Sequence, residues 1–134
     1  MGTTFRHRPD PDARLNESVF AFYPRLGAVA NYVSLHVTDR LTLTDVSQVA
    51  GLERKYFSSY FRLKVGVSFS EWLRQLRVSR AKELMAVRDA SIPCLAFASG
   101  FRDVRTFERA FKRVVGVPPM IYRASVRPES RRLT

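Results

Sequence analysis

Two arginines near the C-terminal end of the chain have a spacing that suits contact with nucleic-acid bases. Arg105 and Arg109 are four residues apart, so on a helix they share one face, whereas Phe107 and Phe111 share another. Each guanidinium can donate two parallel hydrogen bonds to O6 and N7 of a guanine in a DNA major groove. The pattern therefore predicts a helix with a buried aromatic face and a face of guanine-binding donors.

The elements around these arginines have the pattern of a helix-turn-helix. Residues 92–98 predict a short apolar helix capped by Ser91, Gly100 predicts a turn with positive φ, and residues 104–115 predict a basic amphipathic helix. Gly116 ends that helix, and a final short helix follows. A helix-turn-helix places its second helix in a DNA major groove.

The charge of the chain agrees with such a partner. The 134 residues include 23 lysines and arginines against 12 aspartates and glutamates, a formal net charge of +11. This excess favours a polyanionic partner, although charge alone does not choose between DNA, RNA and an anionic membrane, or exclude an inert basic surface. An apolar content of 46% is enough for one core or two small ones.

Several other classes of function find no support in the sequence. No apolar run approaches the roughly 20 residues of a spanning helix, and residues 1–14 lack a secretory apolar region, so a cytoplasmic protein is expected. The single cysteine, Cys94, excludes an internal disulfide and is interpreted as a small buried hydrophobe. His7 and His36 are isolated, so no metal site is expected. The sequence has no glycine-rich phosphate loop, no Ser/His/Asp set and no paired carboxylates in an apolar pocket, so no cofactor and no enzymatic activity are expected.

The rest of the chain also predicts helices, without the period-two alternation of strands. These helices are expected at residues 25–39, 42–51, 54–64 and 69–87. The predicted fold is all-α, with about seven helices. Phe57, Tyr60 and Phe61 are expected to bury one face of the third helix, and Phe97 also has core spacing.

The two halves of the chain repeat each other. When Gly51 is aligned with Gly100, Gly66 follows by 15 residues in the first copy and Gly116 by 16 in the second, and the extra residue falls in the turn. Two helix-turn-helix subdomains joined by a linker helix are therefore predicted. The expected division is an arm that is disordered or loosely packed (1–24), a first subdomain (25–67), the linker helix (68–88), a second subdomain (89–125) and a basic tail (126–134).

Three motifs carry a resemblance that covers about residues 28–123. They are Arg77-x3-Ala81-x2-Leu84, then Ile92-x2-Leu95-Ala96-x3-Gly100-Phe101-x5-Phe107-x3-Phe111-Lys112, and Gly116-Val117-x-Pro119-x2-Tyr122-Arg123. With these motifs the chain resembles the DNA-binding domain of the AraC/XylS family of bacterial transcription regulators. It is similar to the small single-domain members of the MarA and SoxS type, or to a fragment of a larger regulator.

The resemblance implies a sequence-specific regulator that binds an asymmetric promoter site as a monomer, with two recognition helices in adjacent major grooves and RNA polymerase as a partner. The residues expected to contact base edges are Lys55, Ser58, Ser59, Val104, Arg105, Thr106 and Arg109. The residues expected to contact phosphates are Arg54, Arg62, Lys64, Arg102, Lys112 and Arg113.

The chain departs from the family pattern at three positions. Ser47 stands where relatives usually have alanine, and Glu53 and Arg102 stand where they favour a capping serine. Because an arginine opposes the positive end of a helix, Asp103 is expected to cap the second recognition helix instead.

Two alternatives remain open at this point. The basic strip of Arg74, Arg77 and Arg80 would suit a protein-interaction module that contacts RNA polymerase or another regulator, with weak DNA binding. Nonspecific DNA packaging or repair would show binding driven by charge without a preference for sequence.

Overall fold

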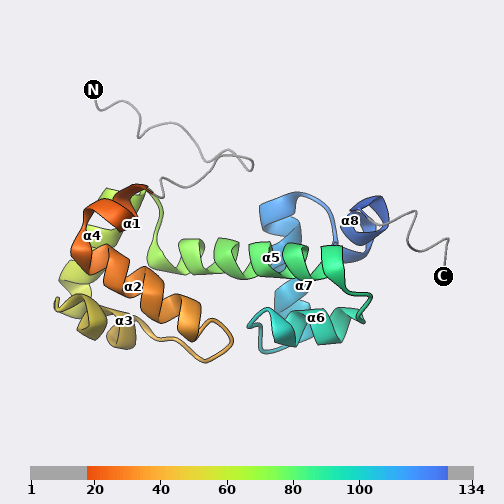
Figure 1. Cartoon of the computed structure of the whole chain (residues 1–134), viewed down its shortest axis with the longest axis horizontal. Coiled ribbons are helices and arrows are strands. Elements are labelled where there is room, and N and C mark those ends of the chain that lie inside the picture. The colour runs from red at the N-terminus through yellow and green to blue at the C-terminus, as the bar shows by residue number, and fades with distance from the viewer. Residues whose placement is uncertain (1–17, 127–134) are drawn as a thin grey trace, which may run out of the picture. The chain divides into compact units, whose positions relative to one another are not determined.

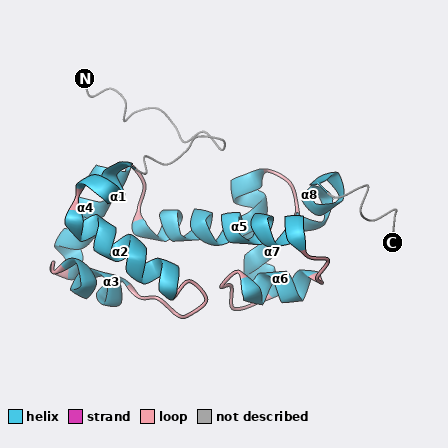
Figure 2. Cartoon of the chain, viewed as in Figure 1, coloured by secondary structure: helices cyan, strands magenta, loops and turns pink. Residues whose placement is uncertain are grey.

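The computed structural model describes residues 18–126, which form only helices and loops (Figures 1 and 2). The all-α prediction is confirmed. Most of the predicted arm (residues 1–17) and tail (residues 127–134) lies outside the described residues. The helices are α1 Ser18–Phe22, α2 Pro24–Leu35, α3 Leu43–Ala50, α4 Arg54–Val65, α5 Phe69–Val87, α6 Ile92–Ala98, α7 Val104–Val115 and α8 Pro119–Val126.

The chain divides into two compact units, one up to Trp72 and one from Leu73 onward. In the first unit α2 packs on α1 and α3, and α3 packs on α4. The centre is aromatic, because the ring of Phe61 lies 5.7 Å from Phe57 and 5.5 Å from both Phe69 and Trp72. Aliphatic side chains complete this core, namely Leu26, Val29, Val33 and Val46.

The second unit has a separate core between α5, α6, α7 and α8. Phe107 is fully buried, and its ring lies 5.3 Å from Phe101 and 5.7 Å from Phe111. The remaining members of this cluster are Val78, Ala81, Met85, Leu95, Ala96 and Ala110. Arg123, on α8, is buried and donates to the Ala90 carbonyl, which ties α8 to the loop before α6.

Side-chain caps fix the starts of α3, α5 and α6. Thr42 and Asp45 form a reciprocal capping box at α3, with both hydrogen bonds at 3.1 Å. The hydroxyl of Ser68 accepts from the Glu71 amide at α5, and that of Ser91 accepts from the Cys94 amide at α6. These contacts satisfy amides that the first turn of a helix leaves unpaired.

Two helices differ from the prediction. The sequence predicts a loose arm through residue 24, yet α1 forms there because Val19 is buried and Phe20 stacks on Trp72 at 5.2 Å. The second helix ends at Leu35 rather than Asp39. Beyond it the chain makes a tight turn, in which the Asp39 amide donates to the His36 carbonyl over 2.9 Å.

The burial of three side chains also differs from the prediction. Cys94 and Phe97 are exposed, because α6 buries the face that carries Leu95, Ala96 and Ser99. Tyr60 is half-buried at the edge of its core rather than inside it. Over the range that the structure describes, no helix is both long and apolar enough to cross a membrane.

Replacing one buried and one exposed phenylalanine of the second unit tests this core. Phe107→Ala should lower the free energy of unfolding by about 3–5 kcal/mol, because it removes a fully buried ring and leaves a cavity. Phe97→Ala should change it by no more than about 0.5 kcal/mol, because that ring is 53% exposed. Urea denaturation followed by circular dichroism measures both, and equal losses would contradict the assigned core.

Candidate nucleic-acid interface

Both helix-turn-helix units contain the same turn. Gly51 and Gly100 have φ angles of +73° and +103°, a region that side chains other than glycine rarely adopt. Each glycine amide donates to the carbonyl three residues back, and the following amide donates to the carbonyl five residues back, at 3.0 or 3.1 Å. These paired bonds satisfy carbonyls at the ends of α3 and α6. The predicted alignment of the two glycines therefore corresponds to a repeated backbone geometry.

The second helix of each unit has one buried and one exposed face. In α4 the buried side chains are Phe57, Phe61 and Val65. Of the side chains predicted to contact bases, Lys55 and Ser59 are exposed and Ser58 is partly exposed. Arg54 and Arg62, predicted for phosphates, are exposed as well. The structure therefore leaves these five side chains of α4 accessible to a ligand.

Lys64 differs from the other predicted phosphate contacts of α4. It is half-buried, and its ammonium lies 4.7 Å from the centre of the Tyr23 ring and 5.9 Å from that of Tyr60. A cation over an aromatic face is attracted by the negative face of the ring. The side chain therefore joins α4 to the residue between α1 and α2.

The start of α7 is capped by Asp103, as the sequence predicts. One carboxylate oxygen accepts from the Thr106 amide over 2.7 Å, and the other accepts from the Thr106 hydroxyl over 3.1 Å. The hydrogen bond from this backbone amide, with that from the hydroxyl and the charges of Arg109 and Arg102, lowers the pKa of Asp103. The carboxylate is thus held charged beside two predicted DNA contacts.

The outer face of α7 carries four basic side chains and one exposed acidic one, Glu108. Arg105, Thr106 and Arg109 are exposed, and so are Arg102, Lys112 and Arg113. Val104 is only partly exposed and packs against the core of the second unit, so less of its side chain is accessible. The hydroxyl of Thr106 is bonded to the cap, which leaves its methyl group for an apolar contact.

Two arginines donate to the ends of helices and a third is half-buried, which the sequence does not predict. Arg25 donates to the carbonyls of Ala50 and Gly51, and Arg80 donates to that of Ala98. Burial lowers the pKa of Arg77, which is about half-buried in α5. Arg77 and Arg80 belong to the basic strip, and Arg77 also to a family motif, but neither pattern indicates which side chain is buried or bonded inside the unit.

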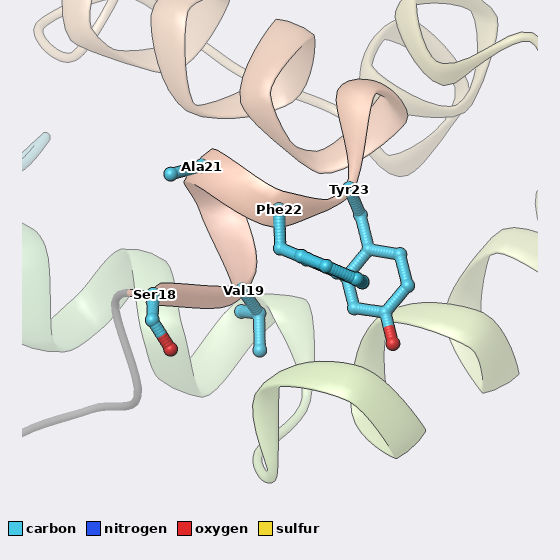
Figure 3. A pocket seen from close by; sticks show the side chains of 5 residues that line it. All are labelled: Ser18, Val19, Ala21, Phe22 and Tyr23. Atoms are coloured by element: carbon cyan, nitrogen blue, oxygen red, sulfur yellow. The ribbon is translucent and has the colours of Figure 1, made fainter.

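A surface hollow of about 440 Å³ lies at α1 and the residue that follows it (Figure 3). Its lining consists of Ser18, Val19, Ala21, Phe22 and Tyr23. The rings of Phe22 and Tyr23 meet edge to face, with centres 4.8 Å apart. This lining has no acid–base pair for catalysis, and no group of three potential metal ligands occurs among residues 18–126.

Two helix-turn-helix units in one chain, each with a cationic second helix, define a class of DNA-binding domain. The model of the helix-turn-helix domain family matches residues 46–125, more than half of the chain. The chain therefore belongs to this family, of the AraC type that the motifs indicate.

Individual relatives agree with this assignment. The regulatory protein PocR of Salmonella typhimurium is 32% identical over 99 residues, 74% of this chain and 33% of PocR. An uncharacterised helix-turn-helix transcriptional regulator of Bacillus subtilis, YobQ, is 29% identical over 69% of this chain and 38% of YobQ. The chain thus spans about a third of PocR and 38% of YobQ.

Among solved structures, the DNA-binding domain of the global transcriptional factor AdpA, in complex with a target DNA, is similar to this chain. The TM-score is 0.72 at 27% identity, and the match covers 78% of this chain and 97% of that domain.

The Asp103 cap gives a dependence on pH. Because the folded-state pKa is lowered, the carboxylate stabilises the fold above the usual Asp pKa of about 3.9, and this contribution is lost as the pH falls through the folded value. Asp103→Asn keeps a capping oxygen and removes the charge. Wild type should therefore be the more stable at neutral pH and lose that advantage in acid, as thermal unfolding across pH can measure. An advantage that persists at a pH below the folded-state pKa of Asp103 would contradict this assignment.

Proposed function

We propose that this chain binds double-stranded promoter DNA in a sequence-specific manner as part of a bacterial transcription regulator. The observation that carries the proposal is the two-faced second helix of each unit. In both α4 and α7, a pair of buried phenylalanines fixes one face, and the exposed side chains of the other are rich in lysine or arginine. Membership of the family and the DNA complex of AdpA support it.

The two helices are proposed to differ in how they contact bases. Arg105 and Arg109 would donate bidentate pairs to guanine, and the methyl group of Thr106 would contact thymine. On α4, Lys55, Ser58 and Ser59 would contact base edges, but a serine hydroxyl accepts or donates to any base and so discriminates weakly. We therefore assign most of the sequence preference to α7.

Phosphates would be bound by basic side chains at the edges of the two helices. These are Arg54, Arg62, Arg102, Lys112 and Arg113. Lys64 would have to leave the rings of Tyr23 and Tyr60 to join them. Such contacts position a protein on the duplex without specifying its sequence.

We further propose that one copy of the chain occupies two successive major-groove segments, at the bacterial nucleoid, and works together with RNA polymerase. Two complete helix-turn-helix units in one chain support the first part, because a dimer of single units is then not needed to contact two grooves.

A protein-interaction module built on the basic strip of α5 is less well supported. Arg80 uses its Nε to donate to the Ala98 carbonyl, and Arg77 is about half-buried. The strip is therefore partly occupied by contacts inside the second unit.

Two arginine variants separate base contact from phosphate contact. Arg109→Ala should weaken binding to the preferred duplex by about 1–3 kcal/mol and remove the preference at one base pair, because it deletes a bidentate donor. Arg62→Ala should weaken binding to all duplexes alike and lower the salt dependence by about one counterion. Fluorescence anisotropy at several salt concentrations measures both effects. An equal loss from Arg109→Ala on preferred and random duplexes would exclude its contact with a base.

Selection of bound sites from a random duplex pool tests the two-groove arrangement. The expected product has two different short boxes whose centres lie about 10 base pairs apart, one helical turn. The box assigned to α7 should be the more strongly conserved. Recovery of a palindrome bound by two copies would contradict the monomeric arrangement.

A further inference from the structure

In each unit an arginine from the preceding helix reaches the end of the first helix of the helix-turn-helix. Nη1 of Arg25, at the start of α2, donates to the Ala50 carbonyl over 2.6 Å and lies 3.3 Å from that of Gly51. Nε of Arg80, on α5, donates to the Ala98 carbonyl over 2.9 Å. The accepting carbonyls belong to the last residue of α3 with its turn glycine, and to the last residue of α6.

The ends of α3 and α6 have no cation of their own. The last carbonyls of a helix have no partner within it and carry the negative end of its dipole. Neither α3 nor α6 has a basic residue in its last turn, whereas α4 ends with Arg62 and Lys64 and α7 with Lys112 and Arg113. In the two helices that precede a turn, the guanidinium from another helix takes this role.

The charge of Arg25 is unfavourable at the start of its own helix, α2, and favourable at the end of α3. Arg25 lies in the first turn of α2, where a positive charge opposes the helix dipole, and that turn contains no acidic residue. Its guanidinium also lies directly against the turn, because a Cβ added at Gly51 would stand 3.0 Å from Nη1. The side chain thus contacts both the helix end and the glycine that redirects the chain.

We propose that Arg25 and Arg80 are positioning residues for DNA binding. Each holds the turn of its own unit and thereby the start of the helix that follows, which begins three residues after Gly51 in one case and four after Gly100 in the other. The inference rests on the proposed function, because the helices positioned are those assigned to DNA. It also makes a claim about the turns that holds without DNA.

The first test uses amide hydrogen exchange of the free protein, followed by NMR. Arg25→Ala should accelerate exchange at Gly51 and Leu52 by about twofold to fivefold, the size of a charge effect at a helix end, and leave Gly100 and Phe101 unchanged. Arg80→Ala should accelerate exchange at Gly100 and Phe101 and leave Gly51 and Leu52 unchanged.

Two variants serve as controls for this experiment. Arg40→Ala removes the same charge from the loop before α3 and should change neither pair of amides. Arg25→Lys keeps a charged donor and should restore most of the protection. Unchanged exchange at both turns, or equal acceleration at both, would overturn the proposal.

The second test measures coupling in DNA binding, on the duplex recovered by site selection. Arg25→Ala combined with Lys55→Ala should cost less affinity than the product of the two single losses, because both act through α4. The loss of affinity from Arg25→Ala combined with Arg109→Ala should equal the product of the two single losses. Arg80→Ala should instead cost less than the product when it is combined with Arg109→Ala, and the full product when it is combined with Lys55→Ala.

The outcomes separate the two claims. If the wild type binds no duplex, but each arginine variant still accelerates exchange at the turn of its own unit, the proposed function fails and the assignment of the turn contacts stands. If DNA binds but every pair of variants is additive, the arginines do not position the DNA-binding helices, and the proposal is wrong.

Discussion

The burial of a phenylalanine pair, four residues apart, on the second helix of each unit is the constraint on which the rest of the interface depends. A helix can rotate about its axis, and its exposed face is defined only when its buried face is fixed. Phe57 with Phe61, and Phe107 with Phe111, are all fully buried in aromatic or mixed cores. Because close-packed rings tolerate little displacement, they set which side chains of α4 and α7 remain accessible.

The parts of the fold that the sequence predicts are those encoded by local chemistry. Gly51 and Gly100 need positive φ, Thr42 and Ser91 satisfy free amides, and Asp103 replaces a missing cap, so each can be recognised within a few residues. For helices with a clear apolar period, such as α7, the sequence predicts the same first and last residues as the structure shows.

The errors occur where the local pattern contains no information on orientation. Helix α6 is apolar at nearly every position, so its sequence does not indicate that Leu95 and Ala96 face inward while Cys94 and Phe97 face solvent. Helix α1 has five residues, too few for a period, and it forms because Phe20 packs on Trp72, which is far away in sequence. In the same way, the contacts of Arg25 and Arg80 with distant carbonyls depend on tertiary structure.

The repeat allows the two candidate DNA faces to be compared position by position. From α4 to α7 the numbering differs by 50, so the buried pairs coincide, and Lys55 corresponds to Arg105 and Ser59 to Arg109. Since the buried phenylalanines occupy the same positions in both helices, a difference in base preference is expected from the outward positions, such as the one where Ser59 corresponds to Arg109. A serine is shorter than an arginine and lacks a fixed fork of donors. It follows that α4 would have to approach the bases more closely, or through water, to discriminate as well as α7.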